Sequence, residues 1–347
     1  MKLSAPATWQ FTSAHKDFWK YKDSWDALNR NLLQNHPLGD SCFVEPLIKY
    51  FATNRDFLAI KTVGSECTGM LLLTSSRFGM MSSFCPSQTE VCPVLVPSLD
   101  DLQTLIDQLP YSNLALQLYR QDPDYSVFPA VSSALIHDVD NHASTVSIDM
   151  DGEFETFWES RSHKLRKNIG RILRIIMEPG FNWRFATVES PDAIEAAVDR
   201  YGDLEVQGWK QAGGTAVHSS NAQGKFYRET LRRFAERGKG VVYELYFEDC
   251  LVSSQLAIAN DEFLITLKTT YNENFSEYSP GKLLDYLMLQ SEFQLGRYER
   301  IEFCTNAGPE LIRWGSRNRP VSDVTIYRNR LSQRLSRLYR HLKRLKP

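Results

Sequence analysis

Residues 267–296, LKTTYNENFSEYSPGKLLDYLMLQSEFQLG, combine groups that bind anions with groups that transfer protons. They predict a strand, a polar loop and a helix that begins at Ser279-Pro280-Gly281-Lys282, with Ser279 as the N-cap and Pro280 in the first turn. Free N–H groups at such a helix start attract anionic oxygens, and a glycine lets a ligand approach the backbone. We therefore predict a phosphate site at Ser279, Gly281 and Lys282. The alternative is an ordinary helix start with Lys282 in solvent.

The end of the preceding strand and the loop that follows it supply one lysine and two tyrosines, Lys268, Tyr271 and Tyr278. A phenol at this position can protonate a leaving group, and Lys268 adds a second cation for an anionic cofactor. The alternative is that these tyrosines reflect strand composition, because tyrosine is common in strands.

The segment LEVQGWKQAGGTAV supplies a second set of candidates, Glu205, Trp209 and Lys210. Glu205 and Trp209 are four residues apart and share one face of the predicted helix. A carboxylate beside an indole and a lysine can act as a general base whose pKa is set by its surroundings. We predict Glu205 as that base, with Trp209 and Lys210 binding substrate. The alternative is a helix end with a half-buried tryptophan and a surface Glu–Lys pair.

Several familiar sites are missing from the sequence. It has no Gly-x-x-x-x-Gly-Lys-Ser/Thr loop, no Gly-x-Gly-x-x-Gly after a strand and no Gly-x-Ser-x-Gly elbow. The segment HDVDNH at residues 137–142 carries metal-binding residue types, but no further ligands stand nearby. We interpret it as a polar linker between two strands and expect no metal. The six cysteines form no Cys-x-x-Cys pair, and we expect them to be reduced.

The bulk composition limits the class of protein. The chain has 347 residues, a net charge of −2 and 42% hydrophobic residues, which predicts about two domains with sizeable cores. The near-neutral balance argues against a dedicated nucleic-acid binder. No apolar h-region and no apolar run of about 20 residues are present. We therefore expect a cytoplasmic protein, or one peripheral to the inner face of a membrane.

The hydrophobic periodicity predicts the elements that must position the candidate residues. In the second half it predicts, in order, a helix over 154–177 with one basic face, a strand, two helices, a three-strand antiparallel meander over 240–271, the helix that begins at Ser279, a strand, a short helix and a last strand. The first half repeats this order more loosely, which suggests a repeated topology with a boundary near residues 138–144.

The last residues, YRNRLSQRLSRLYRHLKRLKP, predict a basic amphipathic helix. Leucines recur at steps of four and three, and no acidic residue balances the arginines and lysines. Such a helix suits an anionic membrane surface or a partner. The alternative is that its leucines pack on the protein's own core.

Taken together, the basic helix, LEVQGWKQAGGTA, LKTTYNENFSEYSPGKLL and IEFCTNAGPELIRWGS form a familiar series. This series resembles the CelD-like acetyltransferase domain of the GNAT superfamily, which is related to the FemABX peptidyltransferases. The resemblance covers residues 154–328 well and 25–119 weakly. It implies an α/β (α+β) fold of two tandem GNAT-like modules, each a mixed, largely antiparallel sheet flanked by helices. The implied parts are a degenerate module over 1–140, an acetyltransferase domain over 141–330 and the tail helix over 331–347.

The resemblance also implies an activity, which is N- or O-acyl transfer from acyl-CoA, such as acetyl-CoA, to an envelope or exopolysaccharide-related acceptor. The donor pyrophosphate would lie at Ser279, Gly281 and Lys282. The superfamily signature Arg/Gln-x-x-Gly-x-Gly/Ala is absent here. Because FemABX relatives use aminoacyl-tRNA, a tRNA donor is an alternative and the one exception to the argument against nucleic acid. A third alternative is a non-catalytic accessory protein of membrane-associated polysaccharide assembly.

Overall fold

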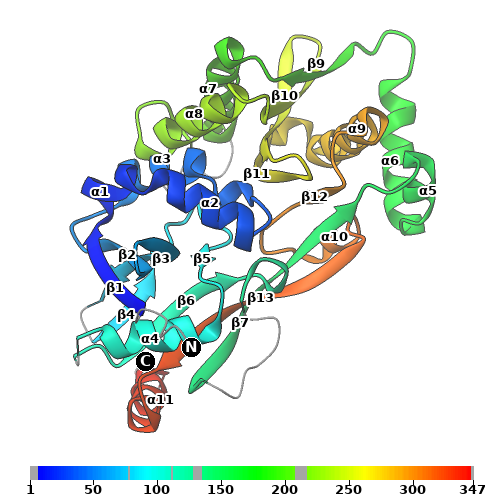
Figure 1. The fold of residues 1–347 in the computed structure, drawn as a ribbon. Coiled ribbons are helices and arrows are strands. Elements are labelled where there is room, and N and C mark those ends of the chain that lie inside the picture. Colours follow the sequence, from blue (N-terminus) through cyan, green and yellow to red (C-terminus); the bar gives the residue numbers. More distant parts are fainter. Residues whose placement is uncertain (1–6, 77–78, 111, 128–134, 208–216, 345–347) are drawn as a thin grey trace. The chain divides into compact units, whose positions relative to one another are not determined.

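The computed structural model describes residues 7–76, 79–110, 112–127, 135–207 and 217–344. The chain forms two compact units, of which unit 1 comprises Met1–Ser144 with Arg319–Pro347 and unit 2 comprises Thr145–Asn318. Both are mixed α/β units, as the sequence predicts (Figure 1). The two boundaries fall inside strands β7 (His137–Asp149) and β13 (Arg317–Tyr327), so each of these strands contributes to both units.

Unit 1 is built on a sheet that is antiparallel except for one pair. Its strands follow the order β1 (Ala7–Ser13), β2 (Asp56–Val63), β3 (Glu66–Ser75), β4 (Met80–Ser83), β6 (Ala115–Gln121) and β13, and the short β5 (Val94–Leu95) pairs with β3. Only β4 and β6 are parallel. Its helices are α1 (Ala14–Asp17), α2 (Lys22–Leu32), α3 (Ser41–Phe51), α4 (Leu99–Gln108) and α11 (Arg330–Arg344).

Unit 2 has a sheet of the same kind. Its strands follow the order β7, β12 (Arg300–Glu302), β11 (Phe263–Tyr271), β10 (Cys250–Ala259), β9 (Gly240–Phe247) and β8 (Trp183–Val188). Only β11 and β12 are parallel. Its helices are α5 (Phe154–Glu159), α6 (His163–Ile176), α7 (Pro191–Gln207), α8 (Ala222–Ala235), α9 (Pro280–Leu295) and α10 (Pro309–Ile312).

The two units share a topology. In unit 1 the meander β2–β3–β4 is followed by α4 and by β6, which pairs parallel to β4. In unit 2 the meander β9–β10–β11 is followed by α9 and by β12, which pairs parallel to β11. Parallel neighbours need a crossover, and α4 and α9 provide it. The predicted repeat of topology is therefore present.

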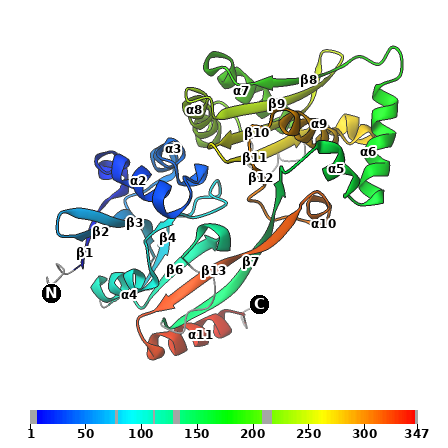
Figure 2. The same cartoon turned by 45° about the vertical axis from the view of Figure 1, so that its right-hand side comes forward.

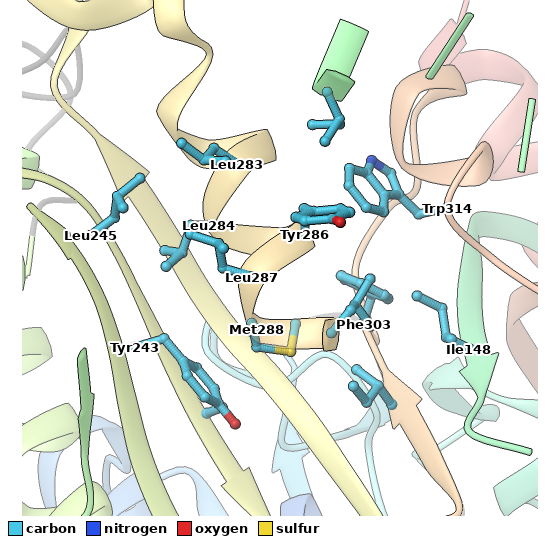
Figure 3. Close-up of a cluster of buried hydrophobic side chains, with 14 of the residues drawn as sticks. Ile148, Tyr243, Leu245, Leu283, Leu284, Tyr286, Leu287, Met288, Phe303 and Trp314 are labelled. Carbon is cyan, nitrogen blue, oxygen red and sulfur yellow. The ribbon is translucent and has the colours of Figure 1, made fainter. Parts of the chain in front are cut away.

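Helix α9 is held in place by an apolar cluster of buried side chains in unit 2. Leu283, Leu284, Leu287 and Met288 point from α9 toward side chains of the sheet such as Leu245 (Figure 3). Helices α7 and α8 lie on the opposite side of β9 and β10 from α6 and α9 (Figure 2). Because its inner face is fully buried, the N-terminus of α9 is fixed relative to the ends of β11 and β12.

Two predicted elements differ in the structure. The single helix expected over 154–177 is two helices, α5 and α6, because Ser162 interrupts it and its Oγ accepts a hydrogen bond from the Leu165 N–H at 3.3 Å. The linker expected over 137–142 is wrong, since these residues begin strand β7. The carboxylate of Asp138 is satisfied there by the Tyr327 hydroxyl at 2.8 Å, a contact that spacing along the chain does not reveal.

Two features are absent from the described residues. No helix among them has the length and the apolar character needed to cross a membrane. No group of three or more His, Cys, Asp or Glu side chains in the same ranges is placed to hold a metal ion.

Candidate active site

A cavity of about 590 Å³ opens in unit 2 where the end of β11, the 3₁₀ turn Glu273–Tyr278, the start of α9 and the loop after β12 meet. Its walls are mainly apolar with a few polar groups. Five of the predicted site residues line it: Lys268, Tyr271, Ser279, Gly281 and Lys282. The structure therefore brings the end of β11 and the first turn of α9 together around one space, which is the usual form of a small-molecule site.

The start of α9 leaves backbone donors free at this cavity. Ser279 precedes the helix in the left-handed conformation, with φ 45° and ψ 56°, and its side chain makes no capping hydrogen bond. The prediction of Ser279 as a side-chain N-cap is therefore wrong, because this backbone conformation is not the extended one that capping requires. Within the described chain the N–H groups of Gly281 and Lys282 have no acceptor. Two donors and the positive end of the helix dipole thus remain for an anion.

Lys282 is held by an acidic partner at the same cavity. Its Nζ lies 2.8 Å from Oε2 of Glu310, which also pairs with Arg313. The hydrogen bond from Lys282 lowers the pKa of the Glu310 carboxyl. Because Glu310 is more than half exposed, this pair exchanges readily with solvent or with an incoming anion.

A carboxyl that the sequence reading missed lies deeper in the cavity. Asp285, one turn after Gly281, accepts a hydrogen bond of 3.1 Å from Nε2 of Gln255. The same Nε2 donates to Oγ1 of Thr269 at 2.9 Å. Burial raises the pKa of Asp285 to about 7, against the opposing effects of Gln255 and Lys282. A carboxyl with this pKa exchanges a proton near neutral pH, as a general acid or base must.

Gln255 itself is fully buried in β10. Among the described residues its Oε1 has no hydrogen-bond partner, although it lines the cavity. An unsatisfied buried oxygen is costly, and a donor group of a bound substrate would satisfy it. A polar residue within the apolar run of β10 and a lone acid within the apolar run of α9 are the sequence signals that identify Gln255 and Asp285.

Glu205 lies behind the cavity wall. It is almost completely buried near the end of α7, and its Oε2 accepts the N–H of Val217 at 2.7 Å. Its Oε1 lies 3.2 Å from Nζ of Lys268 and 3.5 Å from the hydroxyl of Tyr201. Glu205 is therefore connected to the cavity through Lys268, which does line it.

The two tyrosines have different surroundings. Tyr271 is 44% exposed and lines the cavity, and a methyl group added at Gly281 would lie 3.5 Å from its Cδ1. Tyr278 is absent from the lining, and its ring packs against Phe181 and Phe247 with centroid distances of 5.8 and 5.5 Å. The predicted substrate-binding residues Trp209 and Lys210 lie outside the described residues.

The region around the cavity matches the model of a known protein domain. A family model described as an acetyltransferase (GNAT) domain matches residues 163–310, from the start of α6 to α10. The match includes all the cavity-lining residues except Leu311 and Trp314. The sequence matches no curated protein.

Solved structures share the fold over nearly the whole chain. The C-terminal domain of a putative lysylphosphatidylglycerol synthetase from Agrobacterium fabrum has a TM-score of 0.56 and 10% identity, covering 91% of this chain and 95% of that one. FemX has a TM-score of 0.55 and 10% identity, covering 90% and 97%. L-PGS from Bacillus licheniformis has a TM-score of 0.50 and 11% identity, covering 91% and 96%. At this identity the likeness is one of fold.

Fold, domain and site together define the class of this protein. Residues 163–310 match a GNAT acetyltransferase domain, as the sequence motifs indicate, and the fold of the chain is shared with FemX. The GNAT domain makes this protein an acyltransferase, and the cavity at α9 lies within that domain.

Proposed function

We propose that the protein is an acyl-CoA-dependent N- or O-acyltransferase that acts on an envelope or exopolysaccharide-related acceptor. The observation that carries this proposal is the cavity at the start of α9, where two free backbone N–H groups and Lys282 lie one turn from a carboxyl with a pKa of about 7. The resemblance of the motifs to CelD-like acetyltransferases supports the acceptor class. The site as proposed contains no metal.

The donor phosphates would lie at the first turn of α9. The free N–H groups of Gly281 and Lys282 lie at the positive end of the helix dipole. There they would donate charge-assisted hydrogen bonds to a pyrophosphate. Lys282 would exchange Glu310 for a phosphate oxygen, and the backbone at Ser279 would complete the turn around it. Lys268, which also lines the cavity, supplies a second cation.

The reaction needs a base for the acceptor and an acid for the leaving thiolate. The acceptor nitrogen or oxygen attacks the thioester carbonyl carbon, the C–S bond breaks, and the acceptor proton passes to a carboxylate. Tyr271 would then protonate the coenzyme A sulfur, with Tyr278 as the alternative acid. Glu205 is the base proposed from the sequence, acting through water beside Lys268. Asp285 is a second candidate because it lines the cavity and ionises near neutral pH.

Variants distinguish the two bases. We expect Asp285→Asn to abolish the rise of kcat/KM around pH 7 if Asp285 takes the proton, with kcat reduced by about 100-fold or more. If Glu205 is the base, Glu205→Gln has that effect and Asp285→Asn retains the pH profile. Thermal unfolding of both variants checks that the loss is not one of folding, since both side chains are hydrogen-bonded in the structure.

An aminoacyl-tRNA donor is the second candidate, favoured by the charge of α6. The outer face of this helix exposes Lys164, Lys167, Arg171 and Arg174, and the helix contains no acid. Arg171 donates to the carbonyl of Glu277 at 3.1 Å, within the 3₁₀ turn Glu273–Tyr278 that borders the cavity. A polyanionic donor would contact this row beyond the cavity itself.

A competition assay tests the donor. We expect labelled acetyl-CoA to bind the purified protein, to be displaced by longer acyl-CoAs, and to be displaced poorly by aminoacyl-tRNA. The reverse order would identify the tRNA donor. Binding of none of these would remove the catalytic proposal in favour of an accessory role in polysaccharide assembly. The location that we propose for either role is the cytoplasm, at the inner face of the membrane.

A further inference from the structure

Helix α11 is attached to unit 1 by polar side chains. Nε2 of Gln333 donates to Oδ1 of Asp138 at 3.0 Å and to the carbonyl of His137 at 3.3 Å. Arg337 binds the same Asp138 carboxylate, with Nη2 2.5 Å from Oδ1. Ser332, on the neighbouring part of the helix surface, is buried. The inner face of α11 is therefore polar, the reverse of an ordinary surface helix.

The apolar face of α11 is turned away from the unit. Leu331, Leu335 and Leu338 are 65%, 50% and 56% exposed. Their spacing of four and three places them in one stripe on the helix, on the side away from Gln333. Leu342 and Leu345 continue the same spacing in the sequence. An exposed stripe of leucines in this arrangement marks a surface that another apolar phase covers.

The positive charge of the segment indicates which kind of surface covers the leucines. From residue 330 to the end the sequence contains no acid, and its basic residues are Arg330, Arg334, Arg337, Arg340, Lys343, Arg344 and Lys346. The rest of the chain compensates this charge, since the net charge of the whole is −2. A second copy of α11 would bring two basic helices together, which like-charge repulsion opposes. An anionic surface with an apolar interior satisfies both the leucines and the arginines.

We propose that the stripe Leu331–Leu335–Leu338 is a membrane-docking surface for bilayers that contain anionic lipids. The helix would lie in the plane of the interface with its leucines at the acyl boundary and its arginines at lipid phosphates. The contacts of Gln333 and Arg337 with Asp138 would fix the orientation of unit 1 on the surface. The proposal is independent of the chemistry at the cavity, because it rests on residues of unit 1 only.

Vesicle flotation of the full chain tests the surface. The variant is Leu331→Gln/Leu335→Gln/Leu338→Gln, whose three positions are exposed, so that folding is retained. The matched control is Leu295→Gln, which replaces a leucine that is 56% exposed in unit 2. We expect wild type and control to bind vesicles with about one third phosphatidylglycerol, and the triple variant to bind at least tenfold more weakly. Far-UV circular dichroism and thermal unfolding confirm that the three proteins are folded.

Four outcomes would overturn the proposal. Binding of the triple variant equal to that of wild type would exclude the leucine stripe as the membrane-docking surface. Equal binding of wild type to pure phosphatidylcholine vesicles, or no weakening as salt rises from low to about 0.5 M, would exclude the role of anionic lipid. Sedimentation velocity that shows a wild-type dimer and a monomeric triple variant would identify the stripe as a self-association surface instead.

Discussion

At the scale of single residues, Asp285 changes its protonation when the chain folds. Burial in the cavity raises its pKa from the ordinary 3.8 to about 7. Between these values the folded protein holds a proton that the unfolded chain has released, so this group lowers the stability as pH rises through that window. The same property makes it a candidate base, and if Asp285 has that role its reactivity is obtained at the expense of stability above neutral pH.

Asp285→Asn should remove this dependence. We expect the variant to gain stability relative to wild type as pH rises from about 4 to about 7, and the difference to stay constant above about pH 8. Urea unfolding at several pH values measures it. Asp249→Asn, which replaces an exposed aspartate, is the control. A difference between Asp285→Asn and wild type that is independent of pH would contradict the raised pKa.

Lys282 and Glu310 should affect donor binding in opposite directions. We expect Lys282→Gln to raise the KM for a phosphate-bearing donor by about tenfold, the effect of one charge-assisted hydrogen bond. Glu310→Gln should lower it by a few-fold at low ionic strength, because it releases Lys282 from the ion pair. Steady-state kinetics with the donor varied measures both effects. An increase in KM for both variants would mean that the pair itself, rather than free Lys282, is required.

At the scale of elements, the two serines before α6 and α9 test how each helix begins. Ser162 caps α6 through its side chain, whereas Ser279 is left-handed and caps nothing. We therefore expect Ser162→Ala to lower the free energy of unfolding by about 1 kcal/mol and Ser279→Ala to change it by less than about 0.5 kcal/mol. Chemical denaturation measures both. Equal losses would indicate that the Ser279 side chain does cap α9 in solution.

Sequence periodicity was a good guide to the meanders, to α9 and to the repeated topology, because apolar spacing directly reports which face of an element is buried. It was a poor guide where the contacts of one side chain determine the local structure. The break at Ser162 depends on one hydrogen bond, and the strand at Asp138 is joined to residues nearly 200 positions away, Tyr327 and Arg337 among them. At the site, the residues around Ser279 are close in sequence and were found. Gln255 and Asp285 are 30 residues apart, and only the folding of β10 against α9 brings them together.

At the scale of the whole molecule, a strand from the last part of the chain completes the sheet of unit 1. Within unit 1, β13 pairs with β6, and within unit 2, β12 pairs with β7. A buried ion pair secures the first of these arrangements. Nε and Nη2 of Arg319 in β13 both lie 2.7 Å from the carboxylate of Asp122, whose side chain is fully buried.

Breaking this pair should be costly. We expect Arg319→Ala to lower the free energy of unfolding by about 3–5 kcal/mol, because it leaves Asp122 buried without its charged partner. The double variant Asp122→Ala/Arg319→Ala should cost less than the sum of the single changes. Lys239→Ala, which removes an exposed pair with Asp261, should stay within about 1 kcal/mol. Guanidinium unfolding measures the free energy of unfolding of these three variants and of Asp122→Ala. A loss below about 1 kcal/mol for Arg319→Ala would contradict the stabilising role of the buried ion pair.

The late position of β13 in the sequence also affects the order in which the two units are completed during synthesis. Unit 2 is one continuous segment, whereas unit 1 requires residues 319–347. On the ribosome, residues 145–318 can therefore finish folding while the earlier half of the chain still lacks the strand beside β6. Domains usually mature from the N-terminus onward, and here the first part to be made is the last to be finished. Until then the edge of β6 is open to other strands, so a pause near the end of translation would expose the nascent chain to aggregation.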